Sequence, residues 1–500
     1  MHDTNSIAAI DADERTLELG ALFSEVRALR DRVADEGRSL LESLIRGGVE
    51  ADRLENLCHY LCLRRHDIRP LQRRLMCYGL SSLGRLESRV LPTLDAVLSA
   101  LSAMQGMTSP YALPSEAQFF AGEAELSAMT QRLLGSGRPH RRGRIMVTLP
   151  GEAATDPDFI LDLARRGMDV ARINCAHDGP DTWEAMARHV RAAGEKIERR
   201  ITVLMDIAGP KIRTEAVVAD KGAKLTTGDL FRLVASREPY QTEDVRFCAA
   251  VSLPEIVERV EPGHKLRYND GKLEAVVESV SEGEALLRVT HVKAGGVKLK
   301  PEKGLNLPDT ALGLSPLTAK DEGDLAAVIG NADMLGYSFV SRPEDLDLLE
   351  KALGAHPPRI EKLGLVAKIE QPEAVRNLPA LIARAHTLGR PFGVMIARGD
   401  LAAEIGFERV AEMQEEILWL CEAASVPTVW ATQVLEDLVK DGLPSRGEMT
   451  DAAMAARAEC VMLNKGPAVA EAVTLLDTLL ARMDEHIFKK TPTLRALKSW

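Results

Sequence analysis

The first quarter of the chain carries apolar residues at helical spacing. They recur at intervals of three and four residues, first at Leu19, Leu22, Val26, Leu29 and Val33 and again at Leu91, Leu94, Val97, Leu98 and Leu101. Such spacing puts apolar side chains on one face of a helix. We therefore predict an all-α N-terminal extension over residues 1–137. It is followed by the glycine- and arginine-rich segment SGRPHRRG at 136–143, which is typical of a linker.

The pattern then changes to short apolar runs that alternate with helical stretches. Such alternation indicates parallel β/α units, and eight of these units close into a barrel. We predict an α/β protein, a (β/α)8 TIM barrel built from residues 140–214 and 305–490, with a C-terminal tail at 491–500. The predicted strands are the runs at 144–149, 169–175, 202–207, 334–340, 364–370, 392–398, 427–433 and 460–465.

The segment between the third and fourth runs is too long for an ordinary loop. Residues 215–304 carry strand and turn signals of their own, among them Asn269-Asp270-Gly271 between alternating apolar residues, as in a β-hairpin. We predict a small all-β domain inserted at the barrel mouth, where it would act as a lid.

Charge and composition narrow the class of partner. The formal net charge of −11 gives no overall cationic field that would attract nucleic acid or an anionic membrane. No apolar run approaches the roughly 20 residues that span a bilayer, and the acidic N-terminus lacks the apolar segment of a signal peptide. We expect a cytoplasmic homo-oligomer that acts on small molecules.

The seven cysteines are scattered and odd in number, which favours reduced thiols over a disulfide framework. Cys58, Cys62 and Cys77 lie near His59 and His66, so a zinc site is one interpretation. The spacing of Cys58 and Cys62 also fits one buried helix face, and we favour this core interpretation.

Ionisable residues follow two neighbouring predicted strands. Lys368 and Glu370 are two apart on one strand, so their side chains point the same way. Asp400 follows Gly399 after the next strand, where the start of a helix would offer N–H groups to a carboxylate or phosphate. Glu370 and Asp400 would supply two oxygen ligands for Mg²⁺ or Mn²⁺. An ion-pair network of the lysine and the two acids fits the spacing equally well.

Segments from Arg144 to about His486 resemble the pyruvate kinase family, in the family's order. They are GMDVARINCAHDG, LMDIAGPKIRT, KGLNLPD, LTAKDEGDL, AKIEQPEAV, MIARGDLAAEI, WATQVLEDL, PSRGEMTDAA and CVMLN. The resemblance does not reach the N-terminal extension, and no segment resembles the family's C-terminal α/β domain, where its sugar-phosphate effectors bind. The resemblance implies Mg²⁺-dependent phosphoryl transfer from phosphoenolpyruvate to ADP, giving pyruvate and ATP.

The resemblance also implies roles for individual residues. Arg172 corresponds to an arginine that grips the transferring phosphoryl group, and Lys368 to a lysine that neutralises charge on it. Glu370 and Asp400 correspond to the metal ligands, and Thr432 to a threonine near the enolate carbon that must be protonated. The substrate- and nucleotide-binding residues that the resemblance implies are Arg172, Asn174, His177, Arg213, Lys303, Gly399, Asp400 and Thr432.

Two positions depart from the family's pattern for a bound K⁺ ion. Members that need K⁺ usually read Asn-x-Ser-His and Asp-Thr-Lys-Gly-Pro-Glu, whereas this chain has Ala176 at the serine and Lys211 at the glutamate. The resemblance implies that the ammonium group of Lys211 substitutes for K⁺, so we predict that K⁺ is not required. The alternative is that Lys211 is simply exposed to solvent.

Two further departures, at Thr148-Leu149-Pro150-Gly151 and Asn464-Lys465-Gly466-Pro467, leave nucleotide placement open. Two other functions are also alternatives. One is a catalytically silent homologue that binds a metabolite and engages a partner through its N-terminal helices, and the other is a barrel lyase acting on phosphoenolpyruvate or pyruvate. The complete set of implied catalytic residues argues against the first, and the nucleotide-side residues and the inserted domain argue against the second.

Overall fold

A computed structural model describes residues 4–45, 52–236, 238–269, 271–310, 313–355 and 363–492. Within these ranges, eight parallel strands close into a barrel in the order β1-β15-β14-β13-β12-β11-β3-β2, which confirms the predicted fold class. Each strand lies within one predicted run. The strands are β1 (Arg144–Thr148), β2 (Val170–Asn174), β3 (Thr202–Asp206), β11 (Met334–Tyr337), β12 (Gly364–Ile369), β13 (Phe392–Ala397), β14 (Thr428–Ala431) and β15 (Cys460–Leu463).

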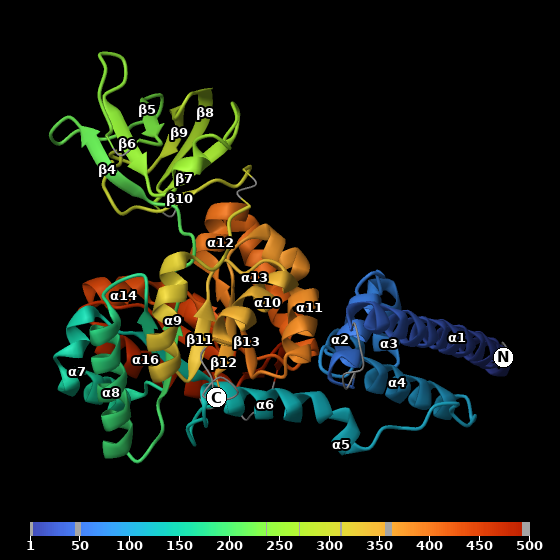
Figure 1. Ribbon diagram of the computed structural model, residues 1–500. Helices are drawn as coiled ribbons and strands as arrows, with labels where there is room; N and C mark the ends of the chain where they lie inside the picture. The colour runs from blue at the N-terminus through green and yellow to red at the C-terminus, as the bar shows by residue number, and fades with distance from the viewer. Residues whose placement is uncertain are drawn as a thin grey trace.

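Helices cover the outside of the barrel (Figure 1). Several of them begin with clear sequence signals, such as the capping box in which Thr318 and Asp321 bond each other's backbone N–H at the start of α9. The helices are α7 (Pro157–Arg166), α8 (Pro180–Lys196), α9 (Ala319–Asn331), α10 (Pro343–Leu353), α11 (Pro372–Thr387), α12 (Arg398–Ile405), α13 (Phe407–Ala423), α14 (Glu436–Asp441), α15 (Arg446–Ala455) and α16 (Val469–Asp484).

The amino-terminal end of the barrel is closed by α6 (Ala121–Leu134), which runs beneath it in Figure 1. Leu133 and Leu134 pack into the barrel interior with Val366 and Met395. A glycine makes room for them, because a Cβ atom at Gly393 would lie 2.4 Å from Cδ2 of Leu133. The barrel interior at this end is therefore filled by side chains, as barrel interiors of this class are.

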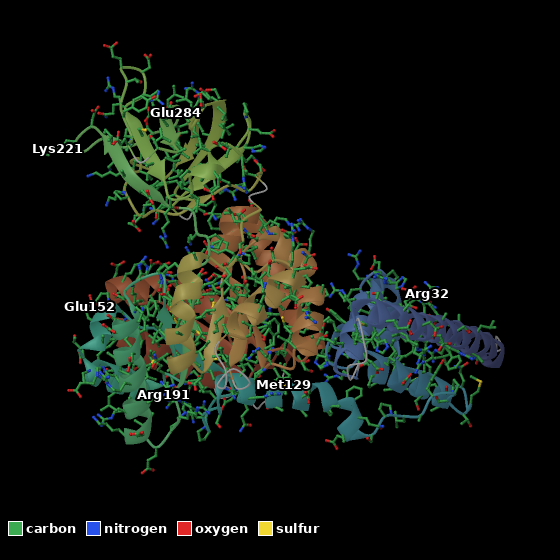
Figure 2. All side chains as sticks on the ribbon, in the orientation of Figure 1. Arg32, Met129, Glu152, Arg191, Lys221 and Glu284 are labelled. Carbon is green, nitrogen blue, oxygen red and sulfur yellow. The ribbon has the colours of Figure 1, made fainter. Side chains whose placement is uncertain are left out.

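The inserted domain is built around a seven-stranded sheet in the order β10-β7-β8-β9-β5-β6-β4 among the described residues. Its strands are β4 (Thr214–Ala219), β5 (Leu230–Val234), β6 (Phe247–Val251), β7 (Lys265–Tyr268), β8 (Leu273–Ser281), β9 (Glu284–Val292) and β10 (Leu305–Asn306). Tyr268 pairs with Leu273 across the predicted hairpin, whose Asp270 lies outside the described residues. Figure 1 shows the domain beyond α12, and Figure 2 shows Lys221 and Glu284 on parts of it remote from the barrel.

The N-terminal extension is helical, as predicted, and packs beside the barrel near α11 (Figure 1). Its other helices are α1 (Thr4–Leu44), α2 (Asp52–Leu63), α3 (Arg69–Cys77), α4 (Val90–Met104) and α5 (Glu116–Phe119). Nδ2 of Asn56 donates to the carbonyl oxygen of Ala423 in α13 at 2.9 Å. Cys58 and Cys62 are buried whereas Cys77 is exposed, and the described residues hold no cluster fit for a metal ion. The burial of Cys58 and Cys62 supports the core interpretation.

The predicted linker is held firmly against the barrel by arginine side chains. Nη1 of Arg141 lies 2.7 Å from Oδ2 of Asp169, and its Nε lies 2.7 Å from Oδ1 of Asp477 in α16. Beyond α16, β16 (Ile487–Phe488) pairs with β17 (Thr491–Pro492). Residues 493–500 of the predicted tail lie outside the described residues.

Candidate active site

The carboxyl ends of the barrel strands surround a cavity of about 190 Å³. A closed parallel barrel brings these ends to one mouth, so residues far apart in the sequence meet there. The predicted site residues that line this cavity are Arg172, Asn174, Lys211, Arg213, Lys368, Glu370, Asp400 and Thr432.

Lys368 contacts three polar side chains at the end of β12. Its Nζ lies 2.9 Å from Oε1 of Glu370 and 3.4 Å from Oδ1 of Asp206, and it donates to Oγ of Ser338 at 2.7 Å. Burial alone would lower the pKa of Lys368, but the nearby carboxylates of Asp206 and Glu370 outweigh it and raise this pKa. Lys368 therefore carries a stable positive charge inside the site.

Arg172 is fixed by residues on the two neighbouring strands. Its Nε donates to Oδ2 of Asp206 at 2.9 Å, and its Nη1 donates to Oγ1 of Thr148 at 3.0 Å. Asp206 is only 1% exposed, and burial would raise its pKa, but Lys368 and Arg172 lower it. The buried Asp206 anion thus holds two cations in place at the floor of the cavity.

Asp400, in the first turn of α12, is paired with Lys211. Nζ of Lys211 lies 2.7 Å from Oδ1 of Asp400, and the Lys211 side chain is 28% exposed. The alternative of a simply solvent-exposed lysine therefore does not describe Lys211. Burial would raise the pKa of Asp400, but the positive charge of Lys211 outweighs burial and lowers this pKa. The pKa of Glu370 shifts the other way, because burial raises it and the neighbouring Asp400 adds to the rise.

Glu370 and Asp400 line the same cavity, and they are the two acids that would hold a divalent cation. The described residues hold no group of three or more histidine, cysteine, aspartate or glutamate side chains arranged for a metal ion. Mg²⁺ commonly takes one or two carboxylates and completes its shell with substrate phosphates and water. The ion-pair network of the alternative interpretation is present only in part, because Lys368 pairs with Glu370 whereas Asp400 pairs with Lys211.

Thr432 adopts a strained backbone conformation with φ of 64°. A β-branched residue rarely occupies this left-handed region, and such strain is concentrated at functional sites. Oγ1 of Thr432 accepts the N–H of Gly399 at 2.8 Å, and its carbonyl oxygen accepts from Nη2 of Arg398 at 2.6 Å. Helix α12 begins at Arg398, one residue before Gly399, and the N–H of Gly399 in its first turn is used to hold Thr432.

The residues expected on the nucleotide side lie around the mouth. Nη1 of Arg213 donates to the carbonyl oxygen of Glu302 at 3.2 Å, next to Lys303 at the junction with the inserted domain. His177 lies just after β2 and is largely exposed. Its pKa is lowered, mainly because part of the ring is removed from solvent and secondly because Lys465 and Arg213 place positive charge nearby. His177, Lys303 and Gly399 are not among the described residues that line the cavity.

Three residues of the site were not predicted as site residues. Asp206 orders Arg172 and Lys368, Ser338 accepts from Lys368, and Arg398 holds Thr432. Asp206 and Arg398 shared one signal in the sequence, a charged residue at the end of an apolar run, whereas Ser338 lies inside its run and carried no such signal.

No helix in the described part of the chain is both long and apolar enough to cross a membrane.

Residues 140–471 match the family described as pyruvate kinase, barrel domain. The chain is 36% identical over 327 residues to a pyruvate kinase of Methylorubrum extorquens, covering 65% of this chain and 64% of that protein. It is 32% identical over 358 residues to a pyruvate kinase of Agrobacterium vitis, covering 70% of each. Because the match covers more than half of the chain, including the barrel that carries the cavity, this chain belongs to the pyruvate kinase family.

Proposed function

We propose that this protein transfers the phosphoryl group of phosphoenolpyruvate to ADP, with Mg²⁺ and without a requirement for K⁺. The observation that carries the proposal is the contact of Lys368 with Asp206, Glu370 and Ser338, in a cavity that Arg172 also lines. A phosphoryl group in transfer carries negative charge on its oxygens. Cations fixed in advance around a small cavity stabilise that charge without reorganisation during the reaction.

Arg172 and Lys368 have different tasks in this proposal. The planar guanidinium of Arg172 binds phosphoryl oxygens with two parallel donors. Lys368 neutralises the group while its bond to the enolate oxygen breaks and the bond to the terminal phosphate oxygen of ADP forms. Glu370 and Asp400 would hold Mg²⁺, which supplies positive charge to the phosphoryl and enolate oxygens when bound.

Thr432 is suited to the last step, in which the enolate takes a proton at carbon and becomes pyruvate. Its Oγ1 already accepts the N–H of Gly399, so its own hydroxyl hydrogen is free to be donated. The bond from Arg398 to its carbonyl oxygen keeps this residue in its strained conformation and so directs the hydroxyl.

Lys211 supports the proposed independence of K⁺. Its ammonium group already places a positive charge beside Asp400 at the mouth. In this proposal His177, Arg213 and Lys303 bind the phosphates of the nucleotide, and the bond from Arg213 to the carbonyl oxygen of Glu302, next to Lys303, supports it.

The deciding experiment measures pyruvate formation by the purified chain from phosphoenolpyruvate, ADP and Mg²⁺. We expect ADP-dependent turnover in the wild type and a loss of about a hundredfold or more in Lys368→Met, since one charge-stabilising donor is worth this much in other enzymes. Lys351→Met, at an exposed position on α10, is the matched control and should keep full activity. Absence of turnover in the wild type would favour the silent homologue, and turnover that ignores ADP would favour the lyase.

A further inference from the structure

A second cavity, of about 380 Å³, lies at the end of the barrel opposite the mouth. It is bounded by α6, by residues 137–144, by the loop that precedes β15 and by the turn between β16 and β17. Met129 marks α6 beneath the barrel in Figure 2. The volume is within the range of about 300–1,000 Å³ that is typical of small-molecule sites.

Basic side chains outnumber acidic ones in the wall of this cavity. The acidic residues there are Glu123, Glu459 and Asp484, and the basic ones are Arg138, Arg141, Arg142, Arg144, Arg457 and Lys489. Each of the three acids is already paired with a cation, namely Arg89, Lys489 and Arg142 respectively. The other cations are paired as well, Arg138 and Arg141 with Asp169 and Arg457 with Glu415, so among the described residues Arg144 is the one cation of this wall without an ion pair.

Arg144 is a buried cation in this wall, with an exposed fraction of 8%. Its guanidinium donates to the carbonyl oxygens of Gly135 and Arg142, both at 2.7 Å, and no carboxylate in the described part of the chain lies within ion-pair distance of it. Burial lowers the pKa of Arg144, although Asp169 opposes this effect. A buried charge without a counter-ion is unfavourable, so this guanidinium would be stabilised by an anion.

Arg457 adds an unused donor to the same wall. Its Nη2 is paired with Glu415, while its Nε is buried and has no hydrogen-bond partner. Buried polar atoms are satisfied in most proteins, and an exception indicates a partner that the chain does not supply. Leu126 and Phe488 give the cavity an apolar side as well.

We propose that this cavity binds a small organic oxyanion, either a phosphate ester or a polycarboxylate, separately from the ligands of the active site. Guanidinium groups suit both chemistries because their donors match paired oxygens, and Leu126 and Phe488 cover the uncharged part of such a molecule. Because α6 forms one wall, the N-terminal extension contributes directly to the site.

The test is isothermal titration of the full chain with ribose 5-phosphate and, separately, with citrate, at constant ionic strength. We expect saturable binding of one of the two probes, weakened at least about tenfold, or 1.4 kcal/mol, in Arg144→Gln and in Arg142→Gln. The Arg142 side chain is 47% exposed, so its variant remains informative if Arg144→Gln does not fold. Arg132→Gln, at an exposed position on the same helix α6, is the matched control and should bind like the wild type.

Two results would overturn the proposal. One is the absence of binding of both probes up to about 10 mM, which is weaker than most specific sites. The other is that Arg142→Gln and Arg132→Gln bind the probe with equal affinity. The bound anion would then lie at the mouth of the barrel and not in this cavity. Because binding is measured without turnover, the result does not depend on whether the proposed phosphoryl transfer occurs.

Discussion

Nζ of Lys211, on the segment that follows β3, donates to Oδ1 of Asp400 in α12 at 2.7 Å. This contact joins a cation that belongs to the chain to one of the two expected metal ligands. A charge that is covalently part of the protein does not have to be recruited from solution, and it keeps the Asp400 carboxylate ionised.

The first prediction concerns the monovalent cation. The turnover of the wild type in NaCl should equal its turnover in KCl within about twofold. The turnover of Lys211→Gln in NaCl should be about tenfold lower than that of the wild type. KCl should restore part of this loss, because a K⁺ ion can then supply the missing charge. Steady-state kinetics in the two salts measures both effects. Lys221→Gln, at an exposed position on the inserted domain, is the control. Strong activation of the wild type by K⁺ would contradict the role of Lys211.

The second prediction concerns the attachment of the inserted domain. Nη1 of Arg267 donates to the carbonyl oxygen of Ala403 at 2.8 Å, at the carboxyl end of the helix that carries Asp400. The last carbonyl groups of a helix lack partners within it and attract a cation. Arg267→Met should therefore loosen the domain and speed proteolytic cleavage at its junctions with the barrel, while the unfolding midpoint of the barrel stays unchanged.

The control for this experiment is Arg288→Met. Arg288 lies on β9 of the same domain and pairs with Glu278 rather than with the barrel. Equal cleavage rates in the two variants would show that the Arg267 contact does not hold the domain.

The third prediction concerns pH and Glu422, a buried residue of α13. Burial raises the pKa of Glu422 to about 7, with Lys489 opposing and Glu87 and Glu459 adding to the rise. The folded state thus favours the protonated form. The stability that protonated Glu422 contributes is complete below the pKa of the unfolded chain, about 4.3. It is lost as the pH rises through the pKa of the folded state, about 7.

Glu422→Gln removes this titration. The free energy of unfolding of the variant, relative to wild type, should rise by about 3 kcal/mol between pH 4 and pH 8. Chemical denaturation across this pH range tests it, with the exposed Glu412→Gln as control. A difference that does not change with pH would mean that folding does not shift the pKa of Glu422.

The fourth prediction concerns the closed end of the barrel. Gly393→Ala should destabilise the protein by about 1–3 kcal/mol, as overpacking does, because the new Cβ would lie 2.4 Å from Cδ2 of Leu133. The double variant with Leu133→Ala should be less destabilised than the sum of the two single variants, which unfolding measurements can resolve. Strict additivity would mean that the two residues do not share this space.

The sequence determined the barrel because its eight strands are short and apolar, and each is followed by a helical stretch. Local patterns of this kind need no knowledge of distant contacts. It also marked Lys368, Glu370 and Asp400, because their positions at strand ends place them at one mouth in any closed barrel of this type.

Only the tertiary structure decided which partners these residues have. The pairing of Lys211 with Asp400, the bond from Gly399 to Thr432 and the arginine-rich cavity beneath the barrel join segments far apart in the chain. The linker shows the same limit, since its composition indicated a simple connection whereas Arg141 is buried between Asp169 and Asp477. The physical reason is that periodicity reports which face of an element is buried, while charge pairing and cavities depend on how the buried faces of different elements meet.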